Sequence, residues 1–146
     1  MKTIFTFLCA VLFMSSAYAQ EDDQSLVERA ALNYIEGFYE GDTLKLKESL
    51  KPDLLKYGYW KDRETGEYGN EIYMTYDGAK DYARRVLEGG NQQGDDAPKE
   101  VEILDMMNHI AAVKITAWWG VDYLLLSKEE DKWMIGQVIW EGPLER

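Results

Sequence analysis

The sequence holds few of the residues on which common functional sites depend. Among its 146 residues there is a single cysteine, Cys9, and a single histidine, His109. A zinc site built from Cys and His ligands is therefore excluded, and we expect no bound metal. A Ser-His-Asp triad would need His109, which lies between two predicted strands in a solvated turn. No glycine-rich phosphate loop is present either, so we expect no nucleotide or other cofactor.

Basic residues are also scarce. The chain has 16 Lys and Arg against 27 Asp and Glu, which gives a formal net charge of −11. An acid excess along the whole chain disfavours nucleic acid or an anionic membrane surface as the partner. Long hydrophobic runs are missing as well, because residues 4–14 are too few to cross a bilayer of roughly 30 Å. The sequence thus predicts no membrane span.

The N-terminus has the pattern of a signal peptide. Lys2 precedes the apolar residues 4–14, and Ala17-Tyr18-Ala19 fits an A-x-A cleavage site. We expect residues 1–19 to be removed and residues 20–146 to form one exported domain, in the periplasm or outside the cell. Since Cys9 is removed with the signal peptide, we expect the mature domain to contain no cysteine and no stabilising disulfide.

The first half of the domain shows helical patterns. Ser25 and Glu28 have the spacing of a capping box, and apolar residues then recur every three or four positions up to Gly41. Asp42 is expected to cap a short helix through Leu50, and Asp77 a third helix over 78–88. Short strands are expected at 57–60 and 72–76.

The second half reads as four strands, at 100–107, 110–118, 121–128 and 133–141, joined by short turns. Such connections predict an antiparallel meander. With a two-residue turn before Val121, Thr116 pairs with Tyr123; with a four-residue loop before Trp133, Leu124 pairs with Gln137. The predicted fold is α+β, with helices early and a curved sheet after them.

Side-chain alternation divides this sheet into two faces. One face is almost wholly apolar and should pack on the helices; it comprises Val113, Ile115, Ala117, Asp122, Leu124, Leu126, Trp133, Ile135, Gln137 and Ile139. The opposite face carries three aromatic residues that need a cover, which a homodimer contact would supply: Trp118, Tyr123 and Trp140.

Several residues are candidates for a site on the apolar face. Asp122 is an acid among apolar neighbours, so it is either a general base or a carboxylate neutralised by backbone amides or a basic residue. Gln137 is either a pocket donor or a hydrogen-bonded core amide. Aromatic residues that could line a pocket, or simply pack in the core, are Tyr34, Tyr57, Trp60, Tyr73 and Trp133.

Four segments carry a likeness to a known family: Tyr34-Ile35-Glu36-Gly37 ahead of Gly41-Asp42, the run at 122–128, Lys132-Trp133-Met134-Ile135, and Val138-Ile139-Trp140. Over residues 25–141 the chain resembles the putative lumazine-binding family of the nuclear-transport-factor-2-like superfamily, which includes ketosteroid isomerase and polyketide cyclases. The resemblance implies a cone, in which a strongly bent, mostly antiparallel sheet wraps around about three helices. It also implies a pocket at the open end and dimers formed through the sheet.

Three functions fit these features. The first is an exported domain that binds a small apolar or aromatic molecule in the cone. The second is a proton-transfer enzyme, such as an isomerase or dehydratase, with Asp122 as general base and Gln137 or a tyrosine hydroxyl stabilising negative charge. The third is a partner-binding module that uses the face of Trp118 and Trp140.

Overall fold

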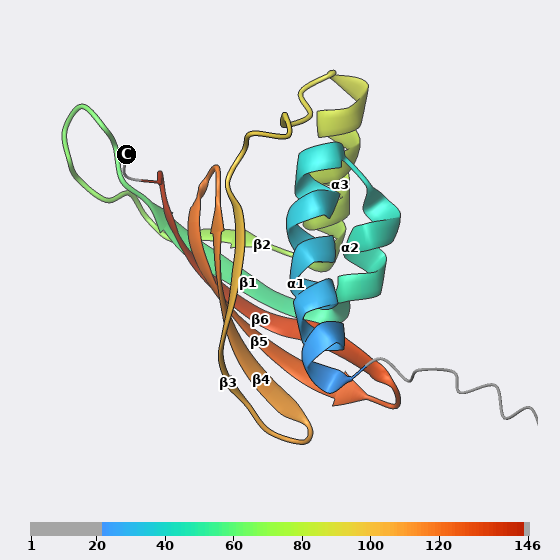
Figure 1. Ribbon diagram of the computed structural model, residues 1–146. Coiled ribbons are helices and arrows are strands. Elements are labelled where there is room, and N and C mark those ends of the chain that lie inside the picture. Colours follow the sequence, from blue (N-terminus) through green and yellow to red (C-terminus); the bar gives the residue numbers. More distant parts are fainter. Residues whose placement is uncertain (1–21, 145–146) are drawn as a thin grey trace, which may run out of the picture.

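The computed structural model describes residues 22–144, which form three helices and one six-stranded sheet (Figure 1). The predicted signal peptide, residues 1–19, lies outside the described residues. The helices are α1 (Asp23–Glu40), α2 (Thr43–Ser49) and α3 (Tyr76–Glu88). The strands are β1 (Leu50–Trp60), β2 (Ile72–Met74), β3 (Lys99–Met106), β4 (Ile110–Ala117), β5 (Gly120–Glu129) and β6 (Lys132–Gly142).

The strand order in the sheet is β2-β1-β6-β5-β4-β3. β3 to β6 form the predicted antiparallel meander, whereas β1 runs parallel to β6 and antiparallel to β2. The sheet is strongly curved, and the three helices lie on one side of it (Figure 1). The α+β prediction, with early helices and a mostly antiparallel bent sheet, is confirmed.

The helices begin where a side chain satisfies free backbone amides. Asp22, rather than the predicted Ser25, caps α1 by accepting a hydrogen bond from the Ser25 amide, so the helix starts before the predicted capping box. Asp42 caps α2 as predicted, through the amides of Leu44 and Lys45. Thr75, not Asp77, caps α3.

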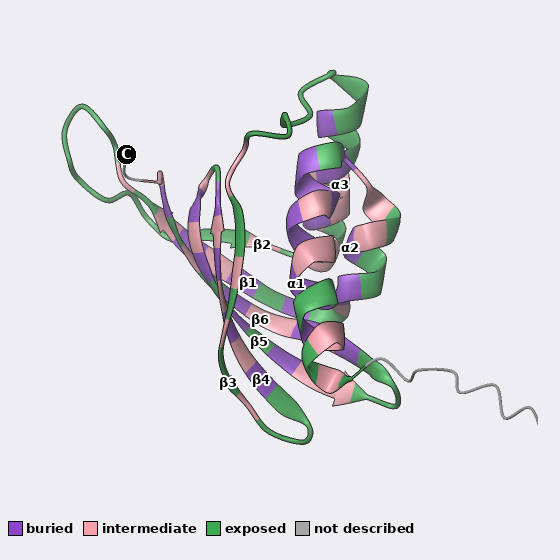
Figure 2. Cartoon of the chain, viewed as in Figure 1, coloured by how far each residue is buried: buried purple, intermediate pink, exposed green. Residues whose placement is uncertain are grey.

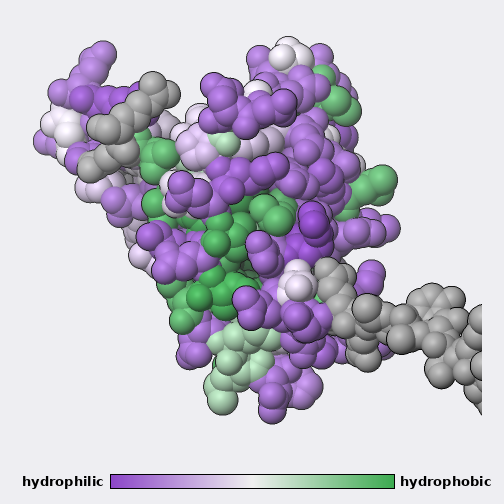
Figure 3. All heavy atoms as spheres, in the orientation of Figure 1, coloured by the Kyte–Doolittle hydropathy of each residue, from purple (hydrophilic) through white to green (hydrophobic). Residues whose placement is uncertain are grey.

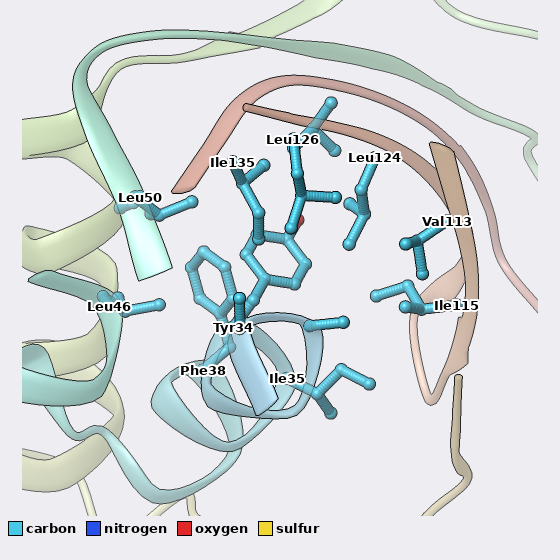
Figure 4. Close-up of a cluster of buried hydrophobic side chains, with 14 of the residues drawn as sticks. Tyr34, Ile35, Phe38, Leu46, Leu50, Val113, Ile115, Leu124, Leu126 and Ile135 are labelled. Carbon is cyan, nitrogen blue, oxygen red and sulfur yellow. The ribbon is translucent and has the colours of Figure 1, made fainter. Parts of the chain in front are cut away.

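The core lies between α1 and the concave face of the sheet. Figure 2 shows buried residues along α1 and on the strands it faces. In Figure 4, Tyr34 points from α1 into a cluster that includes Leu124 and Ile135, and all three side chains are fully buried. An apolar stripe on α1 thus meets the apolar face of the meander, as the periodicity of the two segments predicts.

β1 is much longer than the predicted strand at 57–60. It starts at Leu50, directly after α2, and its ladder with β6 is irregular between Leu50 and Leu55. Pro52 lies in that irregular stretch, where a missing backbone donor is tolerated. The extension has a functional consequence, because it places Lys56 on the buried side of the strand.

The predicted pairing of β4 with β5 is wrong by two positions. Thr116 pairs with Val121, and Ala117 pairs with Gly120 across a turn made of Trp118 and Trp119. The glycine permits this turn: its φ is 150°, and a Cβ there would approach the Glu141 carbonyl oxygen to 2.0 Å. A shift of two leaves each side chain on its predicted face.

The pairing of β5 with β6 contains a bulge that the alternation missed. Leu126 pairs with Ile135, but Leu125 pairs with Gln137, so one extra residue, Gly136, sits in β6. Because the side-chain period is two, the extra residue exchanges the faces beyond it. Val138 is therefore buried, and Leu124 pairs with Val138 rather than with Gln137.

The outer surface is mixed in character. In the view of Figure 3, hydrophobic residues gather over the strands on the β3 side, while the helices present mainly hydrophilic residues. None of the helices within residues 22–144 is long and apolar enough to cross a membrane.

Candidate functional site

A pocket of about 190 Å³ opens between the helices and the β1 end of the sheet. Side chains from six parts of the chain form its wall: α1, α3, β1, β2, the β4–β5 turn and β6. The lining residues are Phe38, Lys56, Trp60, Ile72, Met74, Tyr82, Trp118, Trp119 and Trp140. Of these residues, Lys56 alone carries a charge, so the wall is apolar and largely aromatic apart from one amine.

Lys56 is held at the inner end of the pocket. Its side chain is only 6% exposed, and its Nζ atom donates to the Tyr34 hydroxyl at 2.6 Å and to Asp122 Oδ2 at 3.3 Å. The same nitrogen lies 5.4 Å from the ring centroids of both Tyr34 and Trp140 and 5.9 Å from that of Phe38. These distances are within the range of cation–π attraction, which favours the ammonium form.

Asp122 accepts hydrogen bonds at both carboxylate oxygens. The Tyr34 hydroxyl donates to Oδ2 at 2.6 Å, and the indole Nε1 of Trp119 donates to Oδ1 at 2.6 Å. The side chain is fully buried on the face predicted for it, and it lies behind Lys56 rather than in the pocket wall. Of the roles that the sequence left open, the pairing with a basic residue is the one that the structure contains.

Burial governs the protonation of this cluster. Loss of water around Lys56 lowers the pKa of its amine below the usual value, although the charge of Asp122 acts in the opposite direction. Burial, together with the negative charge of Asp122, raises the pKa of the Tyr34 hydroxyl well above its usual value. Tyr34 therefore stays protonated and remains a donor to the carboxylate.

Trp119 connects the cluster to the pocket wall. Its ring meets the rings of Tyr34, Phe38 and Tyr39 edge to face, with centroids 5.7–6.2 Å apart. The indole is thus fixed both by packing and by its hydrogen bond to Asp122. The aromatic wall and the polar cluster are consequently one connected unit.

A second hollow of about 300 Å³ adjoins the pocket and shares Phe38, Tyr82 and Trp118 with it. Arg85 lines this hollow, with its guanidinium 5.8 Å from the ring centroid of Tyr82. Its neighbour Arg84, in contrast, is paired with Asp81. A second positive charge therefore lies beside the pocket, in the adjoining hollow.

Of the five aromatic residues predicted to line a pocket, two lie in or beneath it and three lie elsewhere. Trp60 lines the pocket, and Tyr34 lies beneath it in the Lys56 cluster. Tyr57 and Tyr73 stack on each other at 5.6 Å and are absent from the pocket wall. Trp133 is buried elsewhere and donates to Asp23.

Gln137 is also away from the pocket, because the bulge at Gly136 turns it to the face opposite the buried Val138. The premise that it shares a face with Asp122 is therefore wrong. The three residues predicted for a dimer contact are also separated, because the bulge turns Trp140 inward and Trp118 lies in the β4–β5 turn. Trp140 and Trp118 line the pocket, whereas Tyr123 is 53% exposed on the outer face.

Lys56 and Trp119 are the site residues that the sequence analysis missed. Local alternation points away from Lys56, since the apolar residues Leu55, Tyr57 and Tyr59 lie on the more exposed side of β1 and the buried row is Leu54, Lys56 and Gly58. No local signal marks Trp119 either, because its orientation depends on a turn at Trp118 and Trp119 that the sequence pattern placed one residue later.

His109 lies, as predicted, in the turn between β3 and β4, where it is exposed. Within residues 22–144, no group of three or more His, Cys, Asp or Glu residues is arranged to hold a metal ion.

Comparison with known proteins identifies the family of this chain. Residues 22–141 match the family described as "Putative lumazine-binding". No curated protein matches the chain significantly.

Solved structures with a similar fold include an NTF2-like protein of unknown function from Silicibacter pomeroyi, with a TM-score of 0.66 and 13% identity over 80% of this chain and 92% of that one. Another, from Methylobacillus flagellatus, has a TM-score of 0.62 and 16% identity over 85% and 94%. A ketosteroid isomerase-like protein from Erwinia carotovora atroseptica has a TM-score of 0.56 and 17% identity over 85% and 100%. These likenesses establish the NTF2-like fold, and the family match establishes that the chain belongs to the putative lumazine-binding family.

Proposed function

We propose that this protein binds a small, flat, largely apolar molecule in the pocket beside Lys56, with one hydrogen-bond acceptor of the ligand turned toward the amine. The composition of the pocket wall is the main support for this proposal. Aromatic and aliphatic side chains surround a pocket of about 190 Å³, and Lys56 is the one charged residue among those that line it. Apolar pockets with few fixed polar groups are typical of small-molecule sites.

The size of the pocket limits the ligand. An apolar protein cavity of about 150 Å³ accommodates benzene. A pocket of about 190 Å³ that adjoins a second hollow therefore suits one ring within the pocket and a second ring reaching toward Arg85. The family name refers to lumazine, a flat bicyclic molecule with carbonyl oxygens, and a ligand of that shape is consistent with these dimensions.

The geometry favours binding over proton transfer by Asp122. Both oxygens of that carboxylate already accept hydrogen bonds, and Lys56 stands between it and the pocket. A partner-binding face built on Trp118 and Trp140 is equally disfavoured, because both residues line the pocket.

We propose further that the protein is exported and forms homodimers. The signal-peptide pattern of residues 1–19 supports export to the periplasm or the medium. Exposed apolar residues on the outer face of the sheet support the dimer, namely Tyr123, Leu125 and Ile139, which are 53%, 51% and 37% exposed.

A titration with two matched probes tests the binding function. 2-Naphthalenemethanol carries a hydroxyl oxygen that can accept from Lys56, whereas 2-methylnaphthalene does not. We expect both to shift the indole NMR signals of the pocket tryptophans, and the alcohol to bind more tightly, because a charged donor strengthens a hydrogen bond.

Two variants of equal bulk complete the experiment. Met74→Trp fills the pocket and should abolish binding of both probes, whereas Leu44→Trp adds the same ring at a position on α2 that is 68% exposed. If both variants lose binding to the same extent, or if both retain it, the assignment of the pocket is wrong.

A further inference from the structure

Lys56 has surroundings that simple ligand binding does not require. An amine that only anchors an acceptor needs a counter-charge, but this one also has a bridging hydroxyl. The Tyr34 oxygen is 2.6 Å from Lys56 Nζ and 2.6 Å from Asp122 Oδ2, accepting from the first and donating to the second. A proton can therefore leave the ammonium and reach the carboxylate through Tyr34 without any group moving far.

The charges of the cluster allow that transfer. Lys56 and Asp122 together carry no net charge, whether as ammonium and carboxylate or as amine and carboxylic acid. Burial disfavours separated charges, which is why the pKa of Lys56 is lowered despite the attraction of Asp122. The aromatic rings around Nζ oppose this tendency by favouring the ammonium. The titratable groups that contact Lys56 are Tyr34 and Asp122, and Tyr82 lines the same pocket.

We propose that Lys56 forms a covalent imine with an aldehyde or ketone bound in the pocket. The inference rests on the proposed binding function, because the carbonyl compound must first occupy the same apolar site. The amine lines that site, so its nitrogen can reach a carbonyl carbon there. Lysines in hydrophobic pockets are a known source of such nucleophiles.

The reaction balances within the cluster. Lys56 passes a proton through Tyr34 to Asp122, and the free amine attacks the carbonyl carbon, so that a C–N bond forms and the C=O π bond opens. The nitrogen passes one of its protons to the adjacent oxygen of the adduct, and Asp122 returns its proton to the nitrogen through Tyr34. The nitrogen then passes a second proton to the hydroxyl group, which leaves as water while the C=N bond forms.

The product is a protonated imine beside an ionised Asp122. One ammonium and one carbonyl compound have become one iminium and one water, and the net charge of the cluster has not changed at any stage. The carboxylate that paired with the ammonium now pairs with the iminium. The site therefore stabilises the adduct with the same contact that holds the free lysine.

Other lysines of this chain provide internal controls. Lys45 and Lys80 form ion pairs with carboxylates, at 2.7–2.8 Å from Glu36 and Glu40 and at 2.9 Å from Asp77. These partners keep the two amines protonated: the pKa of Lys80 is raised by Asp77, and that of Lys45 is raised by its two glutamates, which outweigh partial burial. Both should react with carbonyl compounds less readily than Lys56.

Reductive trapping tests the proposal. The protein is treated with 2-naphthaldehyde and sodium cyanoborohydride at neutral pH, and the mass added at each lysine is measured by peptide mapping. We expect Lys56 to carry several times the label of Lys45 or Lys80, because burial lowers the pKa of its amine whereas the carboxylate partners raise the pKa of the other two. 2-Naphthalenemethanol should compete with the label at Lys56 and leave the others unchanged.

Two variants refine the result. Lys56→Arg keeps the positive charge but forms no such imine, so the label at position 56 should vanish while other lysines keep theirs. Tyr34→Phe removes the bridging hydroxyl and should slow labelling of Lys56 several-fold without closing the pocket. If either variant fails to fold, the map of the unaltered protein still decides the question.

The outcomes separate the two proposals. Binding of 2-naphthalenemethanol without preferential labelling of Lys56 would overturn the imine and leave the binding function intact. Failure of every naphthyl probe to bind or label at position 56 would overturn both. Labelling of Lys56 that the alcohol does not compete for would place the reaction outside the pocket and overturn the inference.

Discussion

The Nζ atom of Lys56 lies 3.3 Å from a carboxylate oxygen of Asp122, although the two residues are 66 positions apart in the chain. Parallel pairing of β1 with β6 and antiparallel pairing of β6 with β5 bring their strands to opposite sides of β6. The side chains meet above that strand, with Tyr34 of α1 joining them from the helical layer. This contact is the centre of the candidate site.

Asp122→Asn should destabilise the protein strongly. The amide leaves the Lys56 ammonium buried without a counter-charge, and breaking a buried ion pair in this way costs about 3–5 kcal/mol. The free energy of unfolding in urea measures the loss. The double variant Lys56→Met/Asp122→Asn removes both charges and should recover most of it. A single variant within about 1 kcal/mol of the unaltered protein would contradict the buried pair.

Gly58→Ala should disturb the pocket through Trp140. A Cβ at Gly58 would lie 2.2 Å from the Trp140 carbonyl oxygen and 2.4 Å from atoms of its ring, so the tryptophan must shift. Overpacking of this kind costs about 1–3 kcal/mol. Thermal unfolding and binding of 2-naphthalenemethanol should both change. Gly69→Ala is the control, because its Cβ would come no nearer than 3.9 Å to a neighbour; equal effects in both would refute the packing argument.

Glu36→Gln should change how stability depends on acidity. Burial by itself would raise the pKa of Glu36, but hydrogen bonds and charges from Lys45 and Lys99 outweigh it and lower the pKa below the usual 4.5. A carboxyl whose pKa is lowered on folding stabilises the protein above that value and loses its contribution as the pH falls through the folded-state pKa. The variant should be about 1 kcal/mol less stable near neutrality.

Urea unfolding at several pH values checks this prediction. The difference between the variant and the unaltered protein should shrink as the pH falls below about 4.5 and disappear once the native carboxyl is protonated. A difference that grows with acidity would have the wrong sign and would exclude the ion pairs as its source.

Tyr123→Glu should convert the proposed homodimer to a folded monomer. Tyr123 is 53% exposed on the outer face, where a glutamate would put an unpaired charge into an apolar contact. Light scattering coupled to size exclusion gives the mass. Leu44→Glu, on the helical side, should leave the dimer intact. A single-chain mass for the unaltered protein would end the dimer proposal.

The exported protein should begin at Gln20, because Ala17-Tyr18-Ala19 fits a signal-peptidase site. Intact-mass spectrometry of the protein from the periplasm or medium decides this. Retention of Met1, or a lipid mass on Cys9, would show that the N-terminus has been misread.

The sequence by itself determined the features that depend on neighbouring residues. The periodicity at Val27, Ala31 and Tyr34 fixed which side of α1 is buried, and Asp42 marked the start of α2. The alternation in β4 and β5 placed Asp122 on the inner face, because a two-residue shift in pairing does not change the face. These patterns arise from burial and local hydrogen bonding, which act over a few residues.

Only the tertiary structure decided the composition of the site. The bulge at Gly136 turned Gln137 out of the inner face and brought Trp140 in, and a single inserted residue leaves no mark in an alternation read from one strand. Lys56 became significant only when β1 paired with β6, since its partners come from α1 and β5. Contacts between distant segments depend on strand order and register, which local patterns do not specify.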